Sequence, residues 1–232
     1  MVSQIGRLRW IAARWLSLKS TRLDGVRLCA DPRTVPYDIR RGLFHRTYEG
    51  SERSLLRAAL KPGDRVLDVG ACTGLLSILC AKIVGAENVL SYEANPALEF
   101  LIRDNFGLNR LVPNLRAKAI TSDGRDIAFY IHESLFSSSL FNRASSKPIS
   151  IQSDRFDAVI DEFHPTLIAM DVEGAEDELF ASSDLPGVAK IVVELHPHII
   201  GQDRVEAVER RLESLDFTRR SQNRKSAYFA RN

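Results

Sequence analysis

Short apolar runs alternate along the chain with segments in which apolar residues recur at helical spacing. The clearest example is 64–77, where Val66, Leu67 and Val69 predict a buried strand and the residues from 75 to 83 predict a helix. Further strands are predicted at 89–93, 115–120, 166–171 and 188–195, and further helices at 51–60, 96–109 and 203–214. Alternating strands and helices predict an α/β fold built on a mostly parallel sheet.

Two parts of the pattern depart from this alternation. Phe217 and the run 228–230 predict two closing strands that form an antiparallel pair. The segment 125–155 interrupts the βα rhythm: 127–132 alternates like an exposed strand, 137–139 is a polar loop, and Ile149 and Ile151 indicate another short strand. An insertion near the strand ends is a natural place for substrate recognition.

The residues from 3 to 19 have the pattern of a basic amphipathic helix. Its apolar positions recur at helical spacing, and arginines and a lysine supply its charge. One interpretation is a helix that makes peripheral contact with a membrane or a partner. The other, which we favour, is a helix packed on its own domain with solvated arginines. We therefore divide the chain into an N-terminal helix and extension, 1–40, and one domain, 41–232.

Composition narrows the class of protein. With 27% charged and 44% apolar residues and a net charge of +2, the 232-residue chain is ordinary for a globular domain and lacks the basic surplus of a dedicated nucleic-acid binder. The three cysteines lie in no metal-binding spacing, which favours a reducing compartment. No apolar run of membrane-spanning length and no signal-peptide pattern is evident. We expect a cytoplasmic protein without a nucleic-acid partner, and the sequence does not indicate its oligomeric state.

Candidate chemistry begins at the turn after the 66–69 strand. The residues read D-x-G-x-x-x-G, because Cys72 occupies the position of the second glycine in a dinucleotide fingerprint, and no P-loop Gly-Lys-Ser/Thr follows. The pattern resembles motif I of class I S-adenosylmethionine (SAM) methyltransferases and disfavours an NAD(P) oxidoreductase. The predicted SAM-binding residues of this turn are Asp68, Gly70, Ala71, Thr73 and Gly74.

Two acidic residues further along the chain complete the predicted cofactor site. Glu93 ends the next strand, where a carboxylate can accept both hydroxyl protons of a ribose. Asp123 follows the third strand and is the best candidate to meet the adenine amine, although a plain turn aspartate explains it equally well.

A second acidic region lies at the ends of the fourth and fifth strands. Asp171, Glu173, Glu194 and His196 should face the same crevice as the glycine turn, because ligands of open α/β sheets bind at the carboxyl ends of the strands. One of these four predicted catalytic residues could act as a general base for an acceptor hydroxyl. Two alternatives remain open: compensation of a helix dipole, and a Mg²⁺ site that lowers the pKa of the acceptor.

Four segments of the chain together resemble the FkbM-type methyltransferase family. They are Tyr48-Glu49, 68–71, the D-V-E-G-A-E block at 171–176, and 194–196. The resemblance covers about residues 40 to 230. It implies a Rossmann-like seven-stranded class I methyltransferase sheet of order 3-2-1-4-5-7-6 with helices on both faces. It also implies SAM-dependent O-methylation of a hydroxyl on a sugar, a glycan or a natural-product small molecule.

Two observations bear on rival functions. Ala169 stands where the family often has a lysine, which keeps open a catalytically silent SAM-binding module that serves as a partner or scaffold. Nucleic-acid methyltransferases usually carry an Asn/Asp-Pro-Pro-aromatic run after the fourth strand, whereas this chain reads D-V-E-G there.

Overall fold

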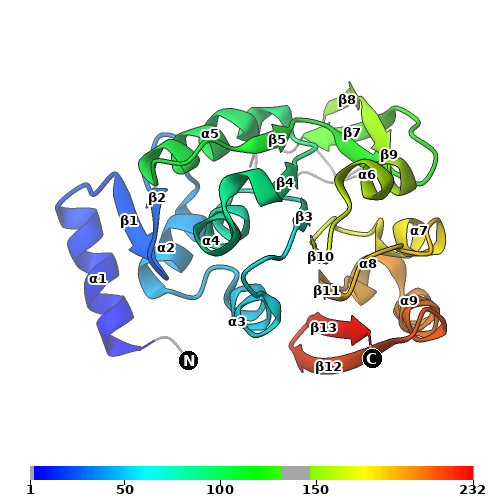
Figure 1. Cartoon of the computed structure of the whole chain (residues 1–232). Coiled ribbons are helices and arrows are strands. Elements are labelled where there is room, and N and C mark those ends of the chain that lie inside the picture. The colour runs from blue at the N-terminus through cyan, green and yellow to red at the C-terminus, as the bar shows by residue number, and fades with distance from the viewer. Residues whose placement is uncertain (1–2, 132–146, 232) are drawn as a thin grey trace.

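The computed structural model describes residues 3–131 and 147–231, and a seven-stranded sheet forms its centre (Figure 1). From one edge to the other, the strands are β12 (Phe217–Asn223), β13 (Ser226–Arg231), β11 (Lys190–Glu194), β10 (Leu167–Met170), β3 (Val66–Val69), β4 (Val89–Tyr92) and β5 (Asn114–Arg116). The strands from β11 to β5 run parallel, and β13 and β12 form the predicted antiparallel closing pair. Numbered within the sheet, the order is 3-2-1-4-5-7-6, which confirms the predicted fold class.

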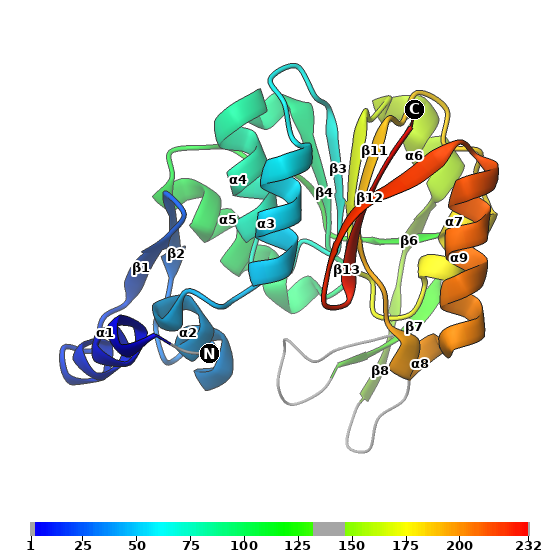
Figure 2. The same ribbon diagram turned by 90° about the horizontal axis from the view of Figure 1, so that it is seen from below.

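Helices cover both faces of the sheet (Figure 2). One face carries α3 (Gly50–Ala59), α4 (Leu75–Val84) and α5 (Glu99–Leu108), and the other carries α6 (Phe156–Phe163), α7 (Glu176–Ala181) and α9 (Gln202–Ser214). Side chains of β3 alternate between the two cores: Val66 joins the α3–α5 side, and Leu67 and Val69 join the other. This two-sided burial explains why the strand is an almost continuous apolar run.

The predicted third strand, 115–120, is two strands in the structure. β5 belongs to the main sheet, whereas β6 (Ala119–Thr121) pairs in parallel with β9 (Ser153–Arg155). Lys118 lies at the break, where its ammonium pairs with Asp154 at 2.8 Å. A charged side chain that must reach this partner cannot continue the buried run.

The interruption at 125–155 is confirmed as a separate hairpin. β7 (Ile127–Ile131) pairs antiparallel with β8 (Lys147–Ile151), at the positions predicted for two short strands. The polar loop predicted at 137–139 lies outside the described residues.

The N-terminal region adds α1 (Gln4–Trp15), the hairpin of β1 (Ser20–Leu23) and β2 (Val26–Cys29), and α2 (Tyr37–His45). The predicted first helix is confirmed, and Ser3 caps it by accepting a hydrogen bond from the Gly6 amide. The division at residue 40 stays a prediction, and α2 runs across that position.

Ser51 lies inside α3, and Glu49 precedes that helix in a left-handed conformation. Short helices flank β4 and β11: η1 (Ala86–Asn88) and η2 (Pro96–Leu98) lie on either side of β4, and α8 (Pro197–Ile200) follows β11.

All three cysteines are thiols, and the cytoplasmic location stays a prediction. Among the described helices, none combines the length and apolar character needed to cross a bilayer.

Candidate functional site

The glycine turn links the carboxyl ends of three strands. The amides of Gly70 and Ala71 donate to the carbonyl oxygen of Tyr92 at the end of β4, at 3.0 and 2.9 Å. Gly70 has a φ of +92°, and a Cβ there would lie 1.9 Å from the carbonyl oxygen of Asp171 after β10. Gly74, at φ +76°, then starts α4. The turn therefore requires glycine at position 70 and places its backbone directly against the acidic block.

Glu93 connects this turn to the loop before η2. The side chain is buried, and its two carboxylate oxygens accept hydrogen bonds from the amides of Cys72 and Asn95, each at 2.8 Å. Burial raises the pKa of Glu93, although both hydrogen bonds oppose that shift. Each carboxylate oxygen keeps further acceptor capacity, so this position is compatible with the predicted contact to ribose hydroxyls.

Asp68 faces α4, behind the turn. Its carboxylate accepts a hydrogen bond from the Ser77 hydroxyl, which in turn accepts one from the Ser91 hydroxyl at 2.9 Å. Burial raises the pKa of Asp68 to about 6. This network fastens β3 and β4 to α4 and thereby fixes the shape of the turn, and a direct contact of Asp68 with SAM stays a prediction.

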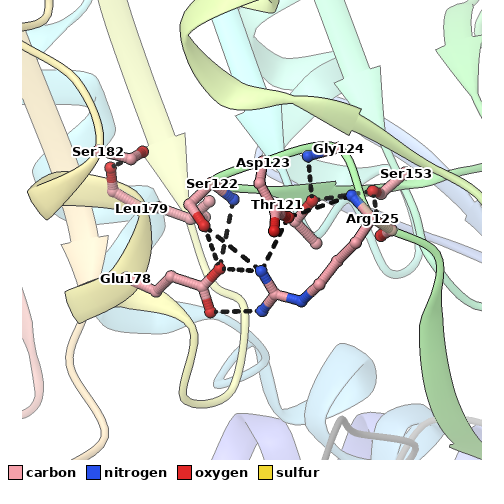
Figure 3. Close-up of polar contacts among 9 residues, drawn as sticks. All are labelled: Thr121, Ser122, Asp123, Gly124, Arg125, Ser153, Glu178, Leu179 and Ser182. Atoms are coloured by element: carbon pink, nitrogen blue, oxygen red, sulfur yellow. Dashed lines mark hydrogen bonds and ion pairs between the residues drawn. The ribbon is translucent and has the colours of Figure 1, made fainter.

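Asp123 belongs to a polar cluster that ties the loop after β6 to α7 (Figure 3). Its carboxylate accepts hydrogen bonds from the backbone and the guanidinium of Arg125, at 3.1 and 2.8 Å. Arg125 also pairs with both carboxylate oxygens of Glu178, at 2.8 and 2.9 Å. Asp123 is exposed and already has this partner, and its contact with adenine stays a prediction.

The second predicted group comes together at the ends of β10 and β11. These strands pair in register, Met170 with Val193, so the residues that follow them reach the same edge. The Nε2 atom of His196 lies 3.6 Å from Asp171 Oδ1 and 3.6 Å from Glu194 Oε1. Glu173 stands in the turn between them and α7, at φ +49°, and its charge contributes to the raised pKa of Asp171.

Glu176 belongs to this cluster, although the sequence analysis did not name it as a site residue. It is fully buried, and its Oε1 atom accepts hydrogen bonds from His196 Nδ1 at 2.5 Å and from the Gly174 amide at 3.2 Å. With the proton on Nδ1, the Nε2 lone pair of His196 faces Asp171 and Glu194. The one signal for Glu176 in the sequence is its place in the D-V-E-G-A-E block. Its partner, His196, is 20 residues further along the chain, so the sequence does not indicate the contact.

Burial and mutual repulsion raise the pKa values of the acidic groups and so favour their uncharged forms. Burial, followed by the charge of Glu194, raises the pKa of Asp171 to about 8. The pKa of Glu194 is also raised, by burial and by Glu52. For His196, burial alone would lower the pKa, but the hydrogen bond and charge of Glu176, together with the other carboxylates, raise it. These upward shifts favour the protonated forms of all three groups.

Unsatisfied polar atoms concentrate around this edge. Among the described residues, five buried side-chain atoms have no hydrogen-bond partner, namely Glu49 Oε2, Thr73 Oγ1, Asp171 Oδ1, Glu176 Oε2 and His45 Nε2. Glu49 adjoins Tyr48, whose hydroxyl lies 3.3 Å from Cys72 Sγ, so this segment also reaches the turn. Since buried polar groups are normally paired, the first three of these atoms suit a site for a polar ligand.

The same cluster offers ligand atoms to a cation. One atom each from Asp171, Glu194 and His196 lies within 4.8 Å of the others. Magnesium prefers an all-oxygen set, whereas imidazole suits transition metals such as Mn²⁺, Fe²⁺ or Zn²⁺. The residues therefore fit a transition metal better than the Mg²⁺ considered from the sequence.

Comparison with known proteins bears on the turn and on the fold. Residues 30–138 match the model of the TRM5/TYW2 methyltransferase domain. The chain has the fold of a class I methyltransferase. The match spans the glycine turn, Glu93 and Asp123, and it ends before Asp171. It supports SAM as cofactor, whereas the comparisons do not support the FkbM-type family expected from the sequence.

Several solved methyltransferase structures are similar to this chain. The TYW2 of Pyrococcus horikoshii in complex with MeSAdo aligns over 97% of this chain and 81% of its own, with a TM-score of 0.49 and 12% identity. The ribosomal protein L11 methylase of Lactobacillus delbrueckii subsp. bulgaricus aligns over 77% and 73%, with a TM-score of 0.46 and 15% identity. A SAM-dependent O-methyltransferase of Thermotoga maritima aligns over 77% and 62%, with a TM-score of 0.43 and 16% identity. At these identities the likeness concerns the fold alone. A search among curated protein sequences found no match.

The expectation of no nucleic-acid partner does not receive support from these findings.

Proposed function

We propose that this methyltransferase fold transfers the methyl group of SAM to an acceptor hydroxyl, with His196 as the general base. The observation that carries the proposal is the position of His196 Nε2 between Asp171 and Glu194, with Glu176 holding the other ring nitrogen. The backbone of Asp171 touches Gly70, so this cluster adjoins the turn proposed to bind SAM.

In this proposal the glycine turn, Glu93 and Asp123 hold the cofactor. The positive φ values of Gly70 and Gly74 set the shape of the turn and let it pack against Asp171 and α5 without a side chain between them. Glu93 accepts hydrogen bonds from the ribose hydroxyls. Asp123 accepts one from the adenine amine, either in place of its bond from Arg125 or in addition to it.

The reaction is an in-line displacement. The acceptor oxygen attacks the methyl carbon, the C–S bond breaks, and S-adenosylhomocysteine leaves with the electron pair. The acceptor proton passes to Nε2 of His196, and the resulting imidazolium is stabilised by Glu176, Asp171 and Glu194. A raised pKa of His196 favours this proton transfer.

A cation at Asp171, Glu194 and His196 is the alternative use of the same atoms. A bound metal would lower the pKa of the acceptor hydroxyl, and His196 would then be a ligand instead of a base. Dialysis against a chelator separates the two: loss of activity that returns on addition of Mn²⁺ or Zn²⁺ supports the metal, and unchanged activity supports the base.

An RNA acceptor is the second candidate, and the TRM5/TYW2 match favours it. The matched residues 30–138 carry the proposed cofactor contacts, whereas Asp171, Glu194 and His196 lie beyond them. The expected Pro-Pro run of nucleic-acid methyltransferases is replaced by Val172-Glu173-Gly174, which favours the hydroxyl of a small molecule or glycan.

The test is methyl transfer from labelled SAM into a cell extract, followed by separation of RNA from small molecules and glycans. Label in the small-molecule or glycan fraction supports the proposal, and label confined to RNA supports the second candidate. His196→Ala is the control variant, which should keep SAM affinity and lose transfer. SAM binding measured by calorimetry without any transfer by the wild type would instead indicate a silent SAM-binding module.

A further inference from the structure

Helix α1 is fixed to the molecule by one face. Gly6, Trp10 and Ala13 are buried, and the Trp10 ring packs against Tyr37 and Phe44 of α2 with centroids 5.2 and 5.9 Å apart. In both views α1 lies at one end of the molecule, with α2 between it and the sheet (Figures 1 and 2). The orientation of α1 is therefore set by packing, and its outer face points away from the sheet.

That outer face is exposed and mostly apolar. Its members are Ile5 at 62% exposure, Leu8 at 66%, Ile11 at 52%, Trp15 at 86% and Leu16 at 69%. At 3.6 residues per turn these side chains share an arc of about 140°, opposite the buried residues. Adjacent large apolar side chains at such exposure mark an interaction surface.

Arginines border this apolar face on both sides. By the same helical geometry, Arg7 and Arg14 lie along one edge and Arg9 lies along the other. All three are exposed, and within the described part of the chain none of them forms an ion pair. The segment 3–19 has no acidic residue, so the surface is wholly cationic around an apolar centre.

We propose that the outer face of α1 docks on an anionic lipid bilayer, with the helix lying in the plane of the membrane surface. An apolar arc with arginines at both edges matches the layered chemistry of a bilayer, in which acyl chains lie below phosphate groups. An RNA surface would complement the arginines but leave Leu8 and Trp15 without an apolar partner. This inference is independent of the methyl acceptor and of His196.

The test uses the full chain and vesicles of phosphatidylcholine with and without phosphatidylserine. Co-sedimentation should require the anionic lipid, and the emission of Trp15 should shift to the blue on binding. The chain has two tryptophans, and Trp10 is already buried, so the shift reports α1 directly. The shift should be absent in Trp15→Ser.

Two variants separate the apolar and cationic contributions. Leu8→Ser with Trp15→Ser should lower vesicle affinity at least tenfold, and Arg7→Gln, Arg9→Gln and Arg14→Gln together should lower it on the order of a hundredfold, since each basic residue contributes about 1 kcal/mol. The matched control is Phe100→Ser on α5, which is 71% exposed and outside α1, and which should bind like the wild type. Unchanged SAM affinity verifies that each variant is folded.

Three results would overturn the proposal. They are equal binding to neutral and anionic vesicles, undiminished binding by the Leu8/Trp15 variant, and absence of vesicle binding by the wild type. If the wild type does not bind vesicles, retention of a tRNA mixture that is lost in the arginine variant would assign the face to RNA. A dimer in gel filtration that the Leu8/Trp15 variant dissociates would assign it to a second copy of the chain.

Discussion

The Glu176→Gln variant tests the proposed arrangement at its most buried contact. Glu176 accepts the Nδ1 hydrogen of His196 at 2.5 Å inside the protein, and Gln has nearly the same shape without the charge. We expect the variant to fold and to bind SAM, because neither Glu176 nor His196 belongs to the glycine turn. Its effect should be concentrated on the protonation of His196.

The expected magnitude follows from the strength of that contact. A hydrogen bond to a charged group contributes about 1.5–3 kcal/mol, and one pKa unit corresponds to about 1.36 kcal/mol. The pKa of His196 should therefore fall by about 1–2 units in Glu176→Gln. Asp171 and Glu194 remain near Nε2, at 3.6 Å, and should keep the shift from being larger.

The assay is NMR titration of the histidine ring protons. The chain has five histidines, and the signal of His196 is identified by its loss in His196→Ala. Glu178→Gln is the matched control, because Glu178 lies on the same helix but pairs with Arg125. With an acceptor in hand, the limb of the pH–rate profile that reports the base should move to lower pH in Glu176→Gln alone.

The stability of the variant provides a second measurement with a defined sign. Because the folded pKa of His196 is raised, its contribution is present below the unfolded pKa, near 6.5, and is lost as the pH rises through the folded value. The stability gap between wild type and Glu176→Gln should thus be larger at pH 6 than at pH 9. An unchanged pKa of His196 in this variant would refute the assigned role of Glu176.

Three further substitutions test other parts of the structure. Gly70→Ala should abolish SAM binding in calorimetry and lower the melting temperature, because its Cβ would meet the Asp171 carbonyl oxygen at 1.9 Å; normal affinity would contradict the assignment of the turn. Glu93→Ala should weaken SAM binding by about 1.5–3 kcal/mol, and a change below about threefold would count against the ribose contact. Asp171→Asn should gain stability relative to wild type as the pH rises from about 4 to 8. Over that window the wild-type protein loses free energy of unfolding, because the pKa of the Asp171 carboxyl is higher in the folded than in the unfolded state. The gain should be about 1–2 kcal/mol in urea melts at pH 8, discounted because the side chain is 36% exposed, and a constant difference across the pH range would contradict it.

The sequence was most informative where backbone geometry restricts residue type. The turn at Gly70 and Gly74 was predictable because its positive φ values favour glycine, and the alternation of strands and helices followed from apolar spacing. The order of the sheet came from resemblance, since spacing alone does not order strands. That order is confirmed, although the family that suggested it is not supported.

Other features depended on contacts between distant residues. Glu176 could not be assigned to His196 from the sequence, because the pair forms only when β11 returns beside β10. The break between β5 and β6 depends on where Lys118 finds Asp154. The interpretation of the first helix as a membrane or partner surface depends on which of its faces α2 covers.

The hairpin of β7 and β8 has a consequence for how this protein can change. Its base is closed by the parallel pairing of β6 with β9, with the hydroxyls of Thr121 and Ser153 2.9 Å apart. The chain thus leaves the domain and re-enters it at neighbouring points, and lengthening such a loop costs only about 0.6 kcal/mol per doubling. We therefore expect that this segment can be exchanged while the sheet, the glycine turn and the His196 cluster stay intact. We expect this insertion to recognise the substrate, so a change of acceptor would then require its replacement alone and would leave the proposed catalytic cluster in place.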